Sequence, residues 1–234
     1  MTEEAYTPDE SGTLPNKTRE EAMRDLEESG LKFKYSCRKQ NLLDSCFSYA
    51  RWLESFKFDY KSALVEYNDL CYTKKHVKSC YRLANILTFN EEIEQNLNEA
   101  YKALEFSCTS LGDGKSCHMA GTMLAEGLVG HGPSPTKALE LFERGCSKDY
   151  PTACFHYGAL LFARIKQSKE PITKKYKVID SWKRGCELGN VFACRNLSHA
   201  YLKGEFVEKN DELRNEYIKM AEKAMKNRRN PDKE

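Results

Sequence analysis

The sequence predicts an all-α protein, an α/α solenoid of five disulfide-stapled helical hairpins that ends in a C-terminal capping helix. Three observations lead to this prediction. All ten cysteines fall into five pairs, and seven or eight residues separate the two members of each pair. The first cysteines of successive pairs are 34, 37, 38 and 40 residues apart, so one unit recurs along the chain. Residues of similar size also recur at fixed distances from every pair.

Small and large residues keep the same register in all five units. Four positions after the second cysteine the residue is small: Ala50, Ala84, Gly121, Gly158 and Ser198. Four positions before the first cysteine the residue is large: Phe33, Tyr67, Leu104, Phe142 and Trp182. These spacings are helical, so each unit is predicted to be a helix A, a short turn and a helix B. A single hairpin cannot bury its apolar faces alone, and neighbouring hairpins are therefore expected to stack.

The chain is expected to be one repeat domain with two polar ends. Residues 1–16 are polar and acidic and are expected to be disordered. The domain is expected to span 17–227, with repeats at 17–57, 58–93, 94–130, 131–168 and 169–205, a capping helix at 211–227 and a frayed tail at 228–234.

The first helix A is expected to start near Thr18, because Thr18 and Glu21 can form a capping box. It runs to about Arg38, and Gly30 is expected to be a weak point within it. The first helix B is expected from Leu42 to about Phe56.

Later boundaries follow from caps and turn residues. Asp59 is expected to cap the second helix A, and Asn96 the third. The segment 127–135 contains three glycines and two prolines, which predicts a long turn before repeat four. A polar connector at 166–171 leads into repeat five. The segment 211–227 has apolar residues at helical spacing and no cysteine, as expected of a capping helix.

The cysteines are expected to pair within each hairpin. In every unit one cysteine ends helix A and the other starts helix B, where antiparallel helices come within disulfide distance. The predicted bridges are Cys37–Cys46, Cys71–Cys80, Cys108–Cys117, Cys146–Cys154 and Cys186–Cys194. Zinc is disfavoured because the spacings are too long for Cys-x2–4-Cys ligand pairs, and no redox-type Cys-x-x-Cys occurs. Reduced thiols buried in the core are the remaining alternative.

The composition and motifs of the chain argue against several classes of function. The formal net charge of +2 over 234 residues gives no reason to expect a nucleic-acid partner. No run of about 18 apolar residues occurs, so no membrane insertion is expected. Residues 1–16 resemble neither a secretory signal nor a matrix presequence. No Ser-x-x-Lys and no glycine-rich phosphate loop occurs, and no catalytic residue is assigned.

The framework Ala-x7-Cys-x7/8-Cys-x3-small resembles the Sel1-like family of α/α repeats in its cysteine-rich form. The resemblance covers about residues 17–205 and includes the segment 153–158, Ala-Cys-Phe-His-Tyr-Gly. Five repeats in a chain of this length are similar to mitochondrial members that assist assembly of respiratory chain complex IV, cytochrome c oxidase. The resemblance implies location in the mitochondrial intermembrane space, import by its oxidative machinery, and a scaffold for immature subunits or copper-delivery proteins. Disulfide-rich chains also suit an oxidising compartment.

Two other functions remain open. The resemblance also implies a haem-binding thiol–disulfide oxidoreductase that reduces copper chaperones, with His118 and either Met123 or Met119 as haem ligands. Met123 follows His118 by five residues, about 140° around a helix, which argues against one iron shared by both. The bacterial relatives suggest a secreted β-lactam-binding repeat protein. The non-enzymatic scaffold is favoured, because no sequence feature marks a disulfide that exchanges easily.

Overall fold

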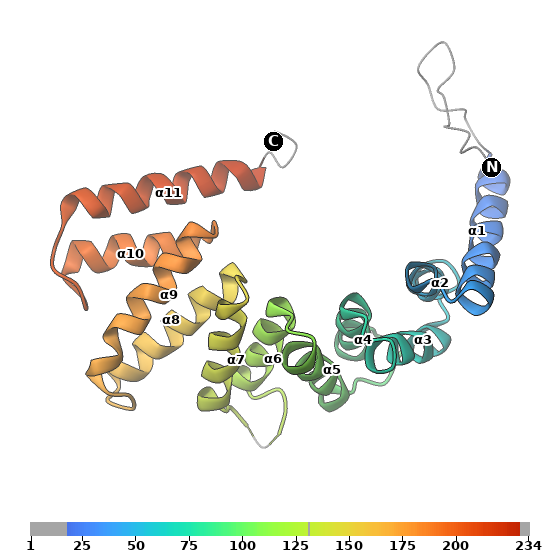
Figure 1. Ribbon diagram of the computed structural model, residues 1–234, viewed down its shortest axis with the longest axis horizontal. Coiled ribbons are helices and arrows are strands. Elements are labelled where there is room, and N and C mark those ends of the chain that lie inside the picture. The colour runs from blue at the N-terminus through green and yellow to red at the C-terminus, as the bar shows by residue number, and fades with distance from the viewer. Residues whose placement is uncertain (1–17, 131, 230–234) are drawn as a thin grey trace, which may run out of the picture. The chain divides into compact units, whose positions relative to one another are not determined.

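The computed structural model describes residues 18–130 and 132–229 (Figure 1). The segment 1–16 that was expected to be disordered, and residues 230–234 of the expected tail, lie outside the described residues. Within the described ranges the chain has no strand, and its regular elements are α1 (Arg19–Gln40), α2 (Leu43–Ser55), α3 (Tyr60–Tyr72), α4 (Val77–Phe89), α5 (Leu97–Ser110), α6 (Gly114–Glu126), α7 (Pro135–Ser147), α8 (Pro151–Lys166), a 3-10 helix (Ile172–Lys174), α9 (Lys175–Glu187), α10 (Val191–Lys203) and α11 (Asp211–Arg229).

The predicted all-α fold of helical hairpins is confirmed. The hairpins are α1–α2, α3–α4, α5–α6, α7–α8 and α9–α10, and α11 follows the fifth. One disulfide joins the two helices of each hairpin across Cα–Cα distances of 4.4–4.7 Å: Cys37–Cys46, Cys71–Cys80, Cys108–Cys117, Cys146–Cys154 and Cys186–Cys194. All ten cysteines are thereby bridged, and every ring contains the turn between helix A and helix B.

The chain forms two compact units, which divide within α3 after Glu66. The first unit contains α1, α2 and the start of α3. The second contains the rest of α3 and the helices α4 to α11.

Each turn inside a hairpin reverses the chain through one residue in the left-handed region. It stands directly before the residue that caps helix B, with φ between 53° and 84°: Asn41, Lys75, Gly112, Asp149 and Gly189. Glycine adopts this conformation without strain, and Asn and Asp tolerate it better than other residues do. The turn brings the end of helix A beside the start of helix B, which is where the two cysteines meet.

Side-chain caps start several helices where the sequence predicted them. The Thr18 hydroxyl accepts from the Glu21 amide at 3.2 Å, and the Glu21 carboxylate accepts from the Thr18 amide at 2.8 Å. Asp59 accepts from the amide of Ser62 at 3.1 Å, and Asn96 from the amide of Glu99 at 3.0 Å. These bonds satisfy amide groups that a helix start leaves without partners.

The first helix is not interrupted at Gly30, the position that the sequence predicted to be a weak point. The helix α1 continues through Gly30, which is buried beneath the indole of Trp52. A Cβ atom at residue 30 would lie 2.1 Å from the ring of Trp52, so only glycine allows this contact. The indole Nε1 also donates to the backbone oxygen of Leu26 at 2.8 Å. Gly30 therefore joins α1 to α2, and its lower helix propensity is offset by packing.

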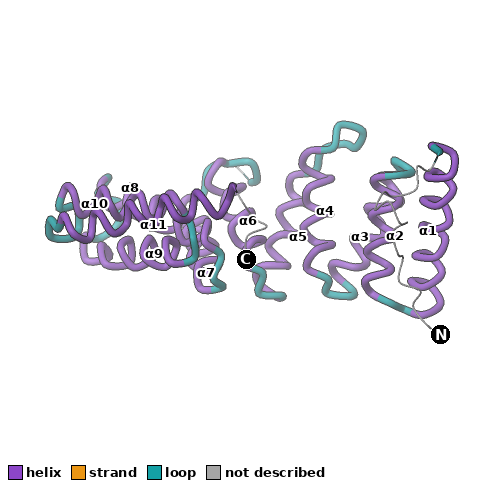
Figure 2. Tube along the Cα trace, turned by 90° about the horizontal axis from the view of Figure 1, so that it is seen from above, coloured by secondary structure: helices purple, strands orange, loops and turns teal. Residues whose placement is uncertain are grey.

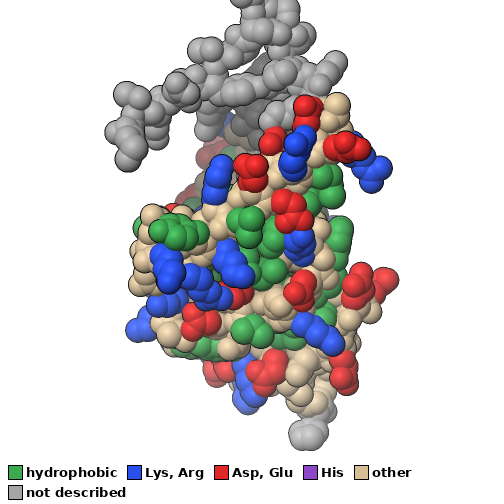
Figure 3. All heavy atoms as spheres, turned by 90° about the vertical axis from the view of Figure 1, so that its right-hand side faces the viewer, with side chains coloured by type: hydrophobic (Ala, Val, Ile, Leu, Met, Phe, Trp, Pro, Cys, Tyr) green, Lys and Arg blue, Asp and Glu red, His purple; other side chains and the backbone are tan. Residues whose placement is uncertain are grey.

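The surface of the first unit mixes apolar and charged side chains. Lys57 lies 5.1 Å from the centroid of the Trp52 ring and pairs with Glu27. Leu31 and Tyr35 on α1 are 62% and 61% exposed. Figure 3, which faces the side of the molecule where α1 lies, shows hydrophobic side chains interspersed with acidic and basic ones.

In the second unit, the repeated small residues serve contacts between hairpins. A Cβ atom at Gly121 on α6 would lie 2.7 Å from the ring of Phe142 on α7. One repeat later, a Cβ atom at Gly158 on α8 would lie 2.4 Å from Nε1 of Trp182 on α9. At these two interfaces the large residue of helix A therefore rests on the small residue of the preceding helix B. This packing explains why the two positions recur in one register.

The helix α11 closes the second unit. It lies along α10 (Figures 1 and 2) and contacts α9 as well. Tyr217 stacks on Tyr201 with ring centroids 5.7 Å apart, and Ala221 is only 4% exposed. The remaining face of α11 is mostly polar, which suits the end of a repeat stack.

Candidate functional site

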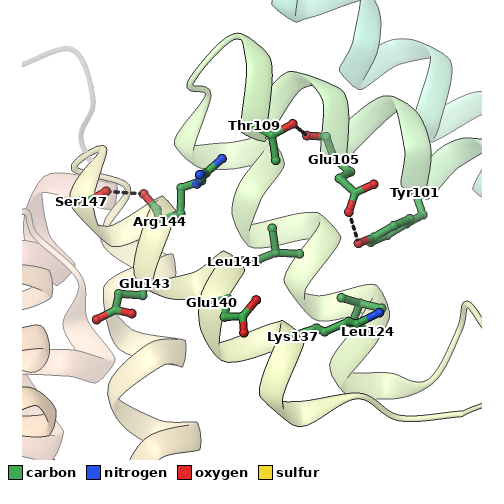
Figure 4. A pocket seen from close by; sticks show the side chains of 10 residues that line it. All are labelled: Tyr101, Glu105, Thr109, Leu124, Lys137, Glu140, Leu141, Glu143, Arg144 and Ser147. Atoms are coloured by element: carbon green, nitrogen blue, oxygen red, sulfur yellow. Dashed lines mark hydrogen bonds between the residues drawn. The ribbon is translucent and has the colours of Figure 1, made fainter.

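A groove of about 590 Å³ runs between α5, α6 and α7 (Figure 4). Two nearly buried leucines, Leu124 and Leu141, supply its apolar lining and are 7% and 9% exposed. The other lining residues are polar or charged and come from α5 and α7: Tyr101, Glu105, Thr109, Lys137, Glu140, Glu143, Arg144 and Ser147. The groove therefore combines a narrow apolar floor with polar walls.

Three charged side chains in this groove form no ion pair with any residue that the structure describes. They are Lys137, Glu140 and Arg144, all on the exposed face of α7. Figure 4 shows Arg144 extending from α7 toward α5. On the opposite wall, the Tyr101 hydroxyl donates to Glu105 at 2.6 Å, and burial together with this carboxylate raises the pKa of Tyr101. The unpaired charges are available to a partner with charges of both signs.

A second hollow of about 450 Å³ lies on the other side of α7, between α7, α8 and α9. It shares Glu143 and Ser147 with the groove. Glu143 accepts hydrogen bonds from the Tyr157 hydroxyl and from Lys177, both at 3.0 Å. Burial and the bond to Glu143 raise the pKa of the Tyr157 hydroxyl. Cys146, at the end of α7, also lines this hollow.

His118 belongs to a cluster of rings from α6, α7 and α8. Its ring centroid lies 5.8 Å from Phe142, 5.5 Å from Tyr150 and 4.7 Å from His156. Its Nε2 atom is buried and has no hydrogen-bond partner among the described residues. Burial, with His156 as the smaller contribution, lowers the pKa of His118 from its usual value of 6.5 to about 4. Both histidines are therefore neutral at pH 7, since burial lowers the pKa of His156 too.

The low pKa of His118 makes the fold sensitive to acid. The unfolded chain binds a proton at His118 below about pH 6.5, whereas the folded chain does so only near pH 4. The free energy of unfolding should therefore fall as the pH drops from about 6.5 to 4, by about 1–2 kcal/mol after allowance for partial solvent screening. His118→Phe, which keeps a ring beside Phe142, should remove this part of the acid sensitivity. Urea unfolding of the unmodified protein and of His118→Phe at pH 7 and pH 4 measures the loss of unfolding free energy in acid. An equal loss in both proteins would show that His118 does not cause it.

The structure does not place His118 and Met123 around one space. Both lie on α6, five residues apart, so their side chains leave the helix about 140° apart. His118 is covered by the rings of α7 and α8, while Met123 is 6% exposed. As placed, the pair does not fit an iron between its two side chains, and haem ligation stays a prediction of the family resemblance.

Sequence reasoning missed both hollows. Residues 137, 140 and 144 are surface positions, and no periodic pattern distinguishes them from other charged residues of the chain. Their spacing along one helix face was the available signal. Within residues 18–130 and 132–229, no cluster of three or more His, Cys, Asp or Glu side chains could hold a metal ion. The same ranges contain no helix long and apolar enough to cross a membrane.

Comparison with known protein families supports the repeat assignment. The Sel1 repeat model matches residues 77–102, 114–150 and 191–214. The chain contains Sel1 repeats. Each matched segment begins with a helix B, at α4, α6 or α10, and continues into the following helix A. The matches therefore include the contacts between hairpins, where Gly121 meets Phe142.

Curated relatives share most of this length. The chain is 29% identical over 207 residues to "Cytochrome c oxidase assembly factor 7" of Xenopus tropicalis, covering 86% of this chain and 88% of that protein. It is 25% identical to the "Cytochrome c oxidase assembly factor 7 homolog" of Drosophila melanogaster, covering 67% and 84%. It is 31% identical to the mouse factor over 144 residues, which are 60% of each chain.

A solved structure shares the fold. The Sel1 repeat protein from Oxalobacter formigenes aligns with a TM-score of 0.62, at 18% sequence identity, over 88% of this chain and 86% of that one. This similarity concerns the arrangement of helices alone.

Proposed function

We propose that this Sel1 repeat protein is an assembly factor for cytochrome c oxidase, respiratory chain complex IV. The observation that carries the proposal is similarity over 86% of the chain to a protein named as an assembly factor of this oxidase. The fold supports a binding role, because helical repeats present extended surfaces to other proteins. The chain would act as a disulfide-stapled scaffold that holds immature subunits or copper-delivery proteins.

The groove between α5, α6 and α7 is the surface that we assign to the client. Leu124 and Leu141 would receive an apolar side chain, and Lys137, Glu140 and Arg144 would pair with flanking charges. Removing these charges from water on binding costs little if each meets an opposite charge of the client. The lining holds three acidic and two basic side chains, so no strong field of one sign favours a nucleic acid.

Complementation tests the proposal. Human cells that lack their own cytochrome c oxidase assembly factor 7 are given this chain, and assembled complex IV is measured on native gels. We expect the chain to restore complex IV. A protein that reaches normal abundance in these cells without any effect on complex IV would contradict the proposal.

A pair of matched variants tests the groove. Lys137→Glu with Arg144→Glu reverses two unpaired charges and should reduce complex IV recovery and client capture by crosslinking at least about tenfold. Lys219→Glu with Lys223→Glu makes the same change on exposed positions of α11 and should have no effect. Equal losses for both variants would show that net charge matters and the groove does not.

Location in the mitochondrial intermembrane space is part of the proposal. Five disulfides need an oxidising compartment to persist, and this space would supply both the oxidation and the client proteins. In fractionated cells the protein should resist added protease in intact mitochondria and be digested after the outer membrane is ruptured. A cytosolic pool with reduced cysteines would contradict this prediction.

A further inference from the structure

The first helix is longer than its partner in the hairpin. The helix α1 has 22 residues, whereas α2 has 13, and Figure 1 shows the N-terminal part of α1 extending beyond α2. Every residue from 19 to 26 is exposed, including Met23 at 48% and Leu26 at 46%. Most helical stability in proteins comes from packing, and no other described element covers these first turns of α1. They are therefore a surface that a helix from another chain can cover.

Two large side chains lie on one outer stripe of α1. Leu31 and Tyr35 are four residues apart, so they share a face of the helix, and Arg24 and Glu28 continue this face toward the N-terminus. The repeat itself does not require apolar residues here. The equivalent positions of α7 and α9, counted from the first cysteine of each hairpin, are charged: Glu140, Arg144, Asp180 and Arg184.

The charges of α1 are divided between its two halves. Residues 19–29 contain five acidic and two basic side chains, and residues 30–40 contain four basic side chains and no acidic one. The helix dipole favours acidic groups in the first turn and basic groups in the last, but its effect falls off within those turns. It does not account for Glu27 and Glu28, or for Lys32 and Lys34, which lie near the middle of the helix. The division makes α1 complementary in charge to an antiparallel copy of itself.

We propose that the outer face of α1 binds the same face of a second copy of this chain, with the two helices antiparallel. Such a pair has two-fold symmetry, so every contact occurs twice. With the two-fold axis between residues 29 and 30, Glu20 lies opposite Lys39 of the second copy, and Glu28 lies opposite Lys32 of the second copy. A parallel pair would place acidic side chains opposite acidic ones. The inference does not depend on the proposed role in complex IV assembly.

The same register places Arg24 opposite Tyr35 of the second copy. A guanidinium group on an aromatic ring is a favourable contact, and it would cover part of a tyrosine that is 61% exposed in the single chain. Leu31 lies near the two-fold axis, where it would pack against the second copy and lose its contact with water. The apolar part of the stripe is therefore at the centre of the pair, with charge pairs on either side.

The charges that the pair requires are accessible in the single chain. Glu28 and Lys32 are largely exposed and contact each other at 4.0 Å. An exposed ion pair of this kind contributes little to stability, so exchanging it for the same pair between two copies costs little. Glu27 and Arg38, by contrast, already pair with residues outside α1. The contact between copies therefore uses the stripe through Glu28 and Lys32.

The oligomeric state tests the proposal. The full oxidised chain is studied by sedimentation velocity over a concentration range of about 1 to 100 µM, where an interface of one helix from each copy should give a reversible monomer–dimer equilibrium. A chain that stays monomeric at every concentration would overturn the proposal, and would leave this face of α1 to a different protein.

Two charge-swapped variants test the surface and its orientation. Glu20→Lys with Glu28→Lys, and separately Lys32→Glu with Lys39→Glu, place like charges opposite each other in the antiparallel pair. Each variant alone should dimerise at least about tenfold more weakly than the unmodified chain. An equimolar mixture of the two should regain the dimer, because opposite charges then face each other again. A mixture that associates no better than the separate variants would overturn the proposal.

Cross-linking locates the contact, with Lys219→Glu and Lys223→Glu on exposed positions of α11 as the control that should dimerise normally. Within one chain Glu20 and Lys39 are 19 residues apart, about 28 Å along the helix, which is too far for a direct amide bond. In a mixture of unlabelled and nitrogen-15-labelled protein, a carbodiimide should join Glu20 of one copy to Lys39 of the other. Cross-links between copies that all lie outside α1, or a control that loses the dimer, would contradict the assignment.

Discussion

Trp182→Ala is expected to lower the free energy of unfolding by about 3–5 kcal/mol, the largest effect of any single substitution considered. Trp182 is 4% exposed, lies on Gly158 and contacts Phe162 with ring centroids 5.6 Å apart. Its removal opens a cavity between the fourth and fifth hairpins. Thermal unfolding should shift by about 10 °C or more, and chemical denaturation gives the free energy.

Two further variants separate the shape of Trp182 from its polarity. The indole Nε1 is buried without a hydrogen-bond partner among the described residues, so Trp182→Phe should cost much less than Trp182→Ala. Gly158→Ala alone should also destabilise, because its Cβ would meet Nε1 at 2.4 Å. Combined with Trp182→Ala it should cost less than the sum of the two single changes. Strict additivity would mean that the two residues do not contact each other.

Cys108→Ser is expected to lower the free energy of unfolding by about 2.7 kcal/mol, the chain-entropy value for a ten-residue ring. Cys37→Ser opens a ring of the same length, so its entropy term is equal. The observed cost should nevertheless be larger at Cys108 than at Cys37. The third repeat contacts hairpins on both sides, through α4 and α7. Thermal unfolding of both variants measures the difference.

The same two variants separate the scaffold from a catalytic role. If the chain is a scaffold, abundance and complex IV assembly should fall together, and more for Cys108→Ser. The double substitution Cys108→Ser with Cys117→Ser controls for the free thiol that the single change leaves. Loss of complex IV while the variant keeps its normal abundance would favour a role in thiol chemistry over a scaffold role.

The fold could be predicted from the sequence because contacts between hairpins restrict the residue type at regular intervals. The small residue after the second cysteine and the large one before the first are the two halves of a contact between hairpins, as at Gly121 and Phe142. Such positions tolerate few residue types, so a periodic pattern of residue size is visible in the sequence. The pairing of Gly30 with Trp52 lies within one hairpin and has no counterpart in the other repeats, so the periodic pattern did not predict it.

The candidate sites are harder to recognise in the sequence than the fold is. Lys137 and Arg144 look like any exposed charges until α5 is placed opposite them. The ten cysteines likewise look equivalent in sequence, although repeats four and five have the shorter spacing. Only the placement of α7, α8 and α9 shows that Cys146 lines the second hollow.

Peptide mapping of native protein without reduction tests most directly whether one bridge holds each hairpin of the repeat scaffold. We predict five crosslinked peptides, which contain the pairs Cys37–Cys46, Cys71–Cys80, Cys108–Cys117, Cys146–Cys154 and Cys186–Cys194. Ten free thiols, or any bridge between two different hairpins, would contradict it.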